Sequence, residues 1–93
     1  MVLRIISGRL IPSTITIGGT AAKIPTTAAT GRITLLITNN GGATLYIGDS
    51  TVTTTNGTPI EIGEKFPLDL DAKVDLYGVT AGVSVDVRIL EGV

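Results

Sequence analysis

The sequence lacks cysteine, histidine and tryptophan, and these absences exclude several kinds of functional site. Without cysteine no disulfide can form, and without cysteine or histidine only carboxylates remain as side-chain ligands for zinc. The serines have no histidine to activate them, and no Ser-x-x-Lys spacing occurs among them. We therefore expect no catalytic residue, no metal site, no cofactor and no enzymatic activity.

Charged and aromatic side chains are also scarce. Charged residues make up 16% of the chain and the net charge is −1, so no basic surface is available for nucleic acid or anionic lipid. Aromatic residues make up 3%, too few for a platform on which bases stack. We expect no nucleic-acid partner, no membrane partner and no small-molecule substrate.

A long hydrophobic run is missing as well. Near the N-terminus, in MVLRIISGRLIP, Arg4 and Arg9 interrupt every apolar stretch. None is long enough for a signal peptide or a membrane span. We therefore expect the chain to be made and folded in a cytoplasm.

Residues 1–12 nevertheless carry more apolar surface than a free tail normally exposes. The candidates for partner contact in this segment are Leu3, Arg4, Ile5, Ile6, Arg9 and Leu10. We predict a strand or an arm at residues 1–12, separated by Pro12 from a β-sandwich domain at residues 13–93. Either the segment folds back as a first strand on its own sheet, or it adds to a sheet edge of a neighbouring subunit.

The residues that are present indicate an all-β chain. Glycine and proline recur so often that the longest stretch without either is 68–77, too short for an ordinary three-turn helix. Threonine, isoleucine and valine together supply 35 of the 93 residues, and these β-branched types suit a pleated surface. A hydrophobic share of 43% argues against disorder.

Alternation of apolar and polar residues predicts a single small β-sandwich or jelly-roll-like domain of about eight short antiparallel strands. The expected strands are 14–17, 22–24, 32–38, 43–47, 59–62, 66–70, 74–77 and 83–90. Val74 and Val83 are expected to face inward. Leu36 interrupts the polar face of its strand, which indicates a central strand covered on both sides. The sequence NNGG at residues 39–42 predicts a tight hairpin turn, because Asn and Gly tolerate positive φ.

Two groups of carboxylates have spacings that resemble functional sites. Asp69, Asp71 and Asp75 resemble part of a calcium loop, but the positions after Asp71 lack the oxygen ligand and the glycine that the motif requires. We expect Asp69 and Asp71 to share a solvated strand face opposite Leu68 and Leu70. Glu61 and Glu64 are rejected as a glycosidase pair, because so small a chain shows no acid–base cleft.

Threonines dominate the segment at residues 49–58. We expect a surface loop at one end of the sandwich, because its residues are small and polar apart from Val52. The irregular spacing of the threonines argues against a flat ice-binding array. Thr53, Thr54 and Thr55 are the candidates for partner contact in this loop.

Two arginines lie at or in the predicted strands. Arg32 and Arg88 are expected to form exposed pairs with carboxylates such as Asp86 or Asp75 on a sheet face. The alternative is that they face a partner. We favour the exposed pairs, since such cross-strand pairs are common.

Two segments contain a distinctive order of short motifs: Gly-Arg, a strand ending in Asn-Asn, a Tyr-Ile-Gly strand, Val-Thr, Asn-Gly-x-Pro-Ile and a closing Val-Asp-Val-Arg strand. They are GRITLLITNNGGATLYIGDSTVTTTNGTPIEIGE at residues 31–64 and DLYGVTAGVSVDVRILE at residues 75–91. Together they resemble a family of small β-rich proteins encoded among the virion genes of tailed bacteriophages. The likeness covers residues 13–91 and leaves the first dozen residues outside it.

The resemblance implies a virion structural protein, and in particular a decoration or cement protein that binds the capsid and stabilises the head. The implied partners are the major capsid protein or other virion proteins, and the implied location is the virion. By analogy with the decoration proteins it resembles, we expect a homo-oligomer, and specifically a trimer. The alternatives are a tail, baseplate or fibre-base component, and a small sandwich that binds carbohydrate or a host surface, which the scarcity of aromatics disfavours.

Overall fold

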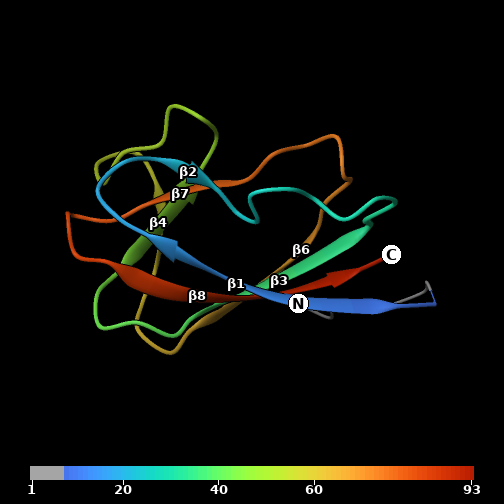
Figure 1. The fold of residues 1–93 in the computed structure, drawn as a ribbon. Coiled ribbons are helices and arrows are strands. Elements are labelled where there is room, and N and C mark those ends of the chain that lie inside the picture. Colours follow the sequence, from blue (N-terminus) through green and yellow to red (C-terminus); the bar gives the residue numbers. More distant parts are fainter. Residues whose placement is uncertain (1–7) are drawn as a thin grey trace.

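Residues 8–93 are described by a computed structural model, in which the chain folds into two antiparallel sheets of four strands each (Figure 1). The long sheet contains, in spatial order, β1 (Leu10–Ile17), β8 (Val85–Gly92), β3 (Thr34–Asn39) and β6 (Lys65–Asp69). The short sheet contains β2 (Ala22–Lys23), β7 (Tyr77–Val79), β4 (Leu45–Gly48) and β5 (Thr58–Ile60). These residues form no helix, and the predicted all-β sandwich is confirmed.

The strands pair as a long hairpin that has been rolled up. β1 pairs with β8, β2 with β7, β3 with β6 and β4 with β5, each pair antiparallel. Two further pairs, β3 with β8 and β4 with β7, join these into the two sheets. Eight strands in two sheets with this pairing form a jelly roll. The jelly-roll-like architecture expected from the sequence is therefore observed.

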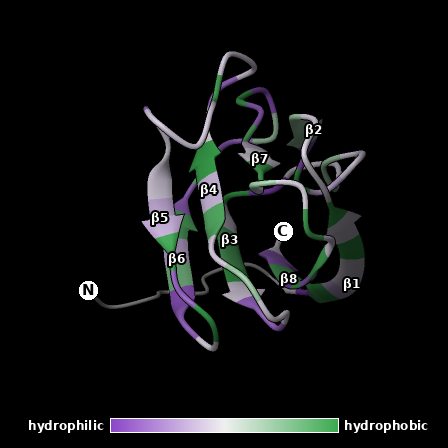
Figure 2. Ribbon diagram, turned by 90° about the vertical axis from the view of Figure 1, so that its left-hand side faces the viewer, coloured by the Kyte–Doolittle hydropathy of each residue, from purple (hydrophilic) through white to green (hydrophobic). Residues whose placement is uncertain are grey.

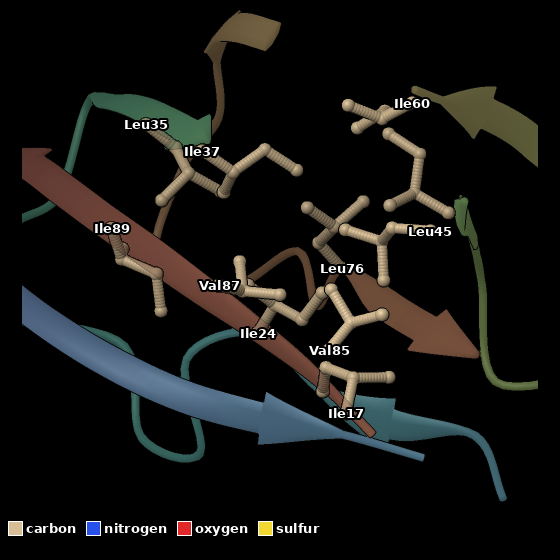
Figure 3. Close-up of a cluster of buried hydrophobic side chains, with 11 residues drawn as sticks. Ile17, Ile24, Leu35, Ile37, Leu45, Ile60, Leu76, Val85, Val87 and Ile89 are labelled. Atoms are coloured by element: carbon tan, nitrogen blue, oxygen red, sulfur yellow. The ribbon is translucent and has the colours of Figure 1, made fainter. Parts of the chain in front are cut away.

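The hydrophobic core lies between the two sheets, and Figure 3 shows its central side chains. The labelled core residues are Ile17, Ile24, Leu35, Ile37, Leu45, Ile60, Leu76, Val85, Val87 and Ile89. β8 follows the expected alternation, with Val85, Val87 and Ile89 buried and Arg88 exposed between them. Each such side chain contributes roughly 1.5–3 kcal/mol when it is fully buried. The hydropathy colouring of Figure 2 shows the same alternation of apolar and polar positions along the ribbon.

The short sheet covers only part of the long sheet. β1 and β8 have 8 residues each, whereas the strands of the short sheet have between 2 and 4. Figure 1 shows two connections over the remaining part of the long sheet, one between β2 and β3 and the other between β6 and β7. These connections, rather than strands, close that end of the core.

The four prolines of the chain lie on or beside the four edge strands. Pro12 lies in β1 and Pro67 in β6, which are the edges of the long sheet. In the short sheet, Pro59 lies in β5, and Pro25 follows the end of β2. Proline cannot donate to a ladder of backbone hydrogen bonds, and it is one of the residues with which proteins prevent a further strand from joining a sheet.

Pro12 lies within β1, and the expectation that it separates an N-terminal segment from a strand starting at residue 14 is wrong. β1 begins at Leu10 and pairs with β8 along its whole length. The Val93 N–H donates to the Arg9 carbonyl oxygen at 3.0 Å, which marks this pair as hydrogen-bonded. Alternation along an antiparallel ladder then places the nitrogen of Pro12 on the free side of β1. The proline therefore removes no bond from the sheet.

The predicted hairpin at NNGG is also wrong, because β3 and β4 belong to different sheets and no residue of this segment has positive φ. Asn39, which is fully buried, connects the sheets instead. Its Nδ2 donates to the carbonyl oxygens of Ala43 at 2.8 Å and Ile60 at 2.9 Å, and its Oδ1 accepts the Gly41 N–H at 3.0 Å. A Cβ on Gly41 would lie 2.9 Å from the Val85 Cα, so this close approach requires glycine.

Two valines predicted to face inward are exposed. Val74 is 51% exposed and Val83 is 57% exposed. Both precede the strands to which they were assigned, because β7 begins at Tyr77 and β8 begins at Val85. An apolar residue in a turn extends an alternating pattern past the end of the strand, and periodicity alone does not locate that end.

Candidate functional site

Thr53, Thr54 and Thr55 lie on an exposed loop between β4 and β5, as predicted. Local hydrogen bonds hold the loop in shape. Thr53 Oγ1 accepts the N–H groups of Thr55 and Asn56 at 3.2 Å, and Asn56 Oδ1 accepts the Thr53 N–H at 2.8 Å. The Gly57 N–H donates to the Thr53 carbonyl oxygen at 2.9 Å. The loop therefore presents an ordered polar surface.

Val52 and Asp49 hold the base of this loop. Val52 is buried, and a Cβ on Gly57 would lie only 2.9 Å from its side chain. Asp49 Oδ1 accepts the Thr51 N–H at 2.8 Å and the Thr51 hydroxyl at 2.6 Å. These hydrogen bonds, the hydroxyl first, lower the pKa of Asp49 below its ordinary value. The carboxylate therefore remains negatively charged at neutral pH.

The candidates in the N-terminal segment are only partly within the described residues. Arg9 and Leu10 are exposed at the start of β1, with Leu10 48% exposed. Figure 1 places the start of β1 and the loop between β4 and β5 at opposite ends of the molecule. Among residues 8–93, the structure therefore does not bring the two groups of candidates together. The remaining candidates lie outside the described residues: Leu3, Arg4, Ile5 and Ile6.

Arg32 is buried, contrary to the prediction of an exposed pair with Asp86 or Asp75. It precedes β3, and its side chain enters the region that the short sheet leaves uncovered. Its Nε donates to the Leu70 carbonyl oxygen at 3.1 Å, and its Nη2 donates to the carbonyl oxygens of Asp71 at 3.1 Å and Val74 at 2.8 Å. Arg32 therefore supplies hydrogen-bond donors to the β6–β7 connection that strands would otherwise supply.

Glu91 is the carboxylate that pairs with Arg32. Arg32 Nη1 lies 3.3 Å from Glu91 Oε2, and the two side chains are 1% and 3% exposed. The same oxygen accepts the Ala29 N–H at 3.0 Å, which ties in the β2–β3 connection. Sequence reasoning missed this pair, although position 91 continues the inward alternation of Val87 and Ile89. An inward-facing glutamate is a signal that a buried base lies nearby.

Arg88 pairs with Asp86, as predicted, on the exposed face of β8. Its Nε lies 2.9 Å from Asp86 Oδ2, and the same oxygen accepts the Asn40 Nδ2–H at 2.9 Å. The hydrogen bond from Asn40 and then the one from Arg88 lower the pKa of Asp86. The cluster is exposed and has the character of a structural surface pair.

The other carboxylates considered from the sequence serve turns or surface pairs. Asp69 is exposed at the end of β6, whereas the expected strand position of Asp71 is wrong, because Asp71 lies beyond that end. Its Oδ1 accepts the Lys73 N–H at 2.8 Å, as in an Asx turn. Glu64 Oε1 accepts the Glu61 N–H at 2.7 Å. Lys23 Nζ lies 3.7 Å from the carboxylate of Asp75. Among residues 8–93, no three Asp or Glu side chains are grouped so that they could hold a metal ion.

Two hollows open on the surface. The first is an apolar groove of about 300 Å³ between β6 and the β4–β5 pair, which we call the inter-sheet groove. It is lined by Ile47, Gly48, Asp49, Thr58, Phe66, Leu68, Leu70, Val74, Asp75 and Leu76. The second, of about 560 Å³, lies between β1 and the β2–β3 connection. There Ser13 Oγ is buried without a hydrogen-bond partner, while Glu91 is already paired with Arg32.

An apolar row crosses the outer face of the long sheet. The strand register aligns Pro12 with Leu90, Leu90 with Leu36, and Leu36 with Pro67. β3 lies between β8 and β6, so the predicted central position is confirmed. The expected cover on both sides is wrong, because Leu36 and Leu90 lie half-buried on the outer face, which neither sheet covers. The row is continuous over all four strands and gives this face an apolar character.

Comparison with protein-family models and with curated proteins finds no match to the chain. The part of the chain that the structure describes has no helix long and apolar enough to cross a membrane. What the protein does must therefore be inferred from its residues and their arrangement.

Proposed function

We propose that the protein is a non-enzymatic structural component of a phage virion, and specifically a decoration or cement protein that binds the capsid and stabilises the head. The observation that carries this proposal is how the buried polar side chains are used. Arg32, Asn39 and Glu91 are all bonded to one another or to the backbone, and each holds connections or sheets together. Such side chains stabilise a scaffold and are not free to act on a substrate.

Three further features support a role in contact rather than chemistry. The sequence motifs at residues 31–64 and 75–91 resemble those of virion proteins. Jelly rolls occur in viral capsid proteins, although they also occur in lectins and cupins, so this support is an analogy of fold. The apolar row on the long sheet and the ordered threonine loop are surfaces that another protein could contact. The proposed location is the virion, after folding in the host cytoplasm, and the proposed partners are the major capsid protein or other virion proteins.

The copy number in purified particles tests the proposal. Particles of the phage that encodes the protein are purified by density gradient, and the chain is quantified against the major capsid protein by mass spectrometry. A ratio that matches the capsid lattice supports a decoration protein. A few copies that remain with isolated tails identify a tail, baseplate or fibre-base component instead. Particles that lack the chain refute a structural role in the virion.

The threonine loop is the described surface that we assign to partner contact. Replacing Thr53, Thr54 and Thr55 together by alanine is expected to weaken co-sedimentation with heads that lack the protein. Arg88→Ala is the matched control, because Arg88 pairs with Asp86 on a different surface. Loss of binding in the Arg88 variant, with folding unchanged, would move the contact to the outer face of β8.

A carbohydrate- or host-surface-binding module is the second candidate, since lectins share the jelly-roll fold. Sugar sites normally combine exposed aromatic rings with convergent polar groups. Tyr46, Phe66 and Tyr77 are all half-buried. Binding of the purified protein to a defined glycan on an array, competed by the free sugar, would favour this candidate over the virion role.

A further inference from the structure

The inter-sheet groove has the properties of a docking site for an apolar segment. It is lined by Phe66 and Leu68 of β6, by Leu70 of the β6–β7 connection and by Ile47 of the short sheet. Val74 stands at the groove with 51% of its surface exposed. The volume of about 300 Å³ is at the lower end of the range for small-molecule pockets, and it suits a few aliphatic side chains.

The polar groups along this groove are acidic. Asp49 and Asp75 both line it, and none of the lysines or arginines among residues 8–93 does. Hydrogen bonds from Thr51 keep the Asp49 carboxylate charged, while Asp75 is partly compensated by Lys23 at 3.7 Å. A complementary segment would therefore combine apolar side chains with a positive charge.

The chain itself contains such a segment at residues 1–7, MVLRIIS. Leu3, Ile5 and Ile6 supply aliphatic side chains, and Arg4 supplies a positive charge among them. Addition of this segment to a sheet edge as an extra strand is disfavoured, because a proline lies on or beside each edge strand. Side chains inserted into a groove avoid that obstacle.

The connection to β1 favours the groove of a second copy over the groove of the same chain. Residues 1–7 precede β1, which lies three strand positions from β6 in the order β1-β8-β3-β6. Three spacings of about 4.8 Å give a crossing of roughly 14 Å. Seven extended residues reach at most roughly 25 Å, so about four of them are used before β6 is reached. Too few remain to turn around β6 and place both Leu3 and Ile5 in the same chain's groove.

We propose that residues 1–7 of one copy insert their aliphatic side chains into the inter-sheet groove of a second copy, with Arg4 facing Asp49 and Asp75. This contact gives a structural basis for the homo-oligomer expected from the resemblance. It does not depend on the virion role, and it is tested on the isolated full-length protein.

Cross-linking distinguishes the two copies. The chain has no native cysteine, so only introduced thiols react. Variants Ile5→Cys and Val74→Cys are prepared separately, mixed, and treated with a short bismaleimide cross-linker, with each variant treated alone as a control. A mixed dimer that exceeds either control supports the proposal. The double variant reports the same-chain alternative: a cross-link that forms only within a single chain overturns the proposal, and so does the absence of any cross-link.

A charge placed in the groove gives an independent test. Val74→Lys puts a positive charge beside the site proposed for Arg4, and sedimentation equilibrium is expected to show self-association weakened about tenfold or more, as for loss of an interface anchor. Val83→Lys is the matched control, because Val83 is 57% exposed and does not line the groove. Circular dichroism confirms that both variants remain folded. Equal self-association of the two variants would overturn the proposal.

Discussion

Replacement of Arg32 by methionine is expected to destabilise the protein strongly. Arg32→Met keeps an unbranched side chain of similar length. It removes the arginine that pairs with the buried Glu91 carboxylate, which then retains the hydrogen bond from the Ala29 N–H. It also removes the donors that Arg32 gives to the carbonyl oxygens of Leu70 and Val74. Removing one partner of a buried ion pair costs about 3–5 kcal/mol. That is a large part of the roughly 5–15 kcal/mol by which a domain is stable.

Urea denaturation followed by circular dichroism measures this loss. For a domain of this size the slope in urea is on the order of 1–3 kcal/mol per molar, so the midpoint should fall by about 2 M. The melting temperature should fall by roughly 12 °C or more. Arg88→Met is the matched control, because it removes an arginine from an exposed pair whose side chains are 57% and 37% exposed. That pair is expected to contribute less than about 1 kcal/mol.

The comparison of the two arginine variants can refute the reasoning. If Arg32→Met and Arg88→Met shift the urea midpoint equally, the buried network contributes no more than a surface pair. An intact midpoint with faster amide exchange confined to residues 25–31 and 70–76 would instead mean that Arg32 orders the connections without stabilising the sandwich.

Three further outcomes are expected. Replacing Thr53, Thr54 and Thr55 by alanine should lower the melting temperature by only a few degrees, since all three side chains are exposed, and a drop of more than about 10 °C in calorimetry would contradict this. Asn39→Ala should cost about 2–4 kcal/mol in urea denaturation, because it leaves buried backbone carbonyls without donors; a cost below about 1 kcal/mol would mean that water replaces the amide. NMR titration should place the pKa of Asp86 below its ordinary value, so its contribution to stability is present above the unfolded pKa and is lost as pH falls through the lower folded pKa. Asn40→Ala should raise that pKa, and an unchanged titration would show that the Asn40 hydrogen bond does not persist in solution.

The parts of the fold that could be predicted from the sequence are those governed by alternation. The centre of β8, with Val85, Val87 and Ile89 inward, follows directly from a period of two. The central position of β3 was indicated by Leu36, which interrupts that period. The jelly-roll class follows from many short strands separated by turn residues. The ends of the strands were predicted less accurately, because Val74 and Val83 continue the alternation of apolar and polar residues but lie in turns before the strands.

The candidate sites were predicted less well, because their geometry depends on which segments meet in space. NNGG has the composition of a hairpin turn, yet Asn39, the last residue of β3, bonds through its side chain to Ala43 in the β3–β4 connection and to Ile60 in the short sheet. A charged arginine beside a predicted strand favours an exposed side chain, yet the side chain of Arg32 occupies the region that the short sheet leaves uncovered. Both outcomes depend on which segments meet in space, and local composition does not contain that information. The exposed threonine loop was predicted correctly because its turn depends on neighbouring residues alone.

The rolled-hairpin pairing of the strands has a kinetic consequence. Among the eight described strands, β1 pairs only with β8, at the other end of the chain, and β8 is also the strand that joins β1 to β3. β1 and β3 cannot form their hydrogen bonds to β8 until β8, at the far end of the chain, has come into contact with them. Most of the loop-closure entropy is therefore lost before these contacts compensate for it. We expect folding on the order of milliseconds to seconds, as for other all-β domains with distant pairings. During that interval the apolar side chains of β1 and β3 are exposed, so we expect aggregation to compete with folding and chaperones to raise the yield of folded protein.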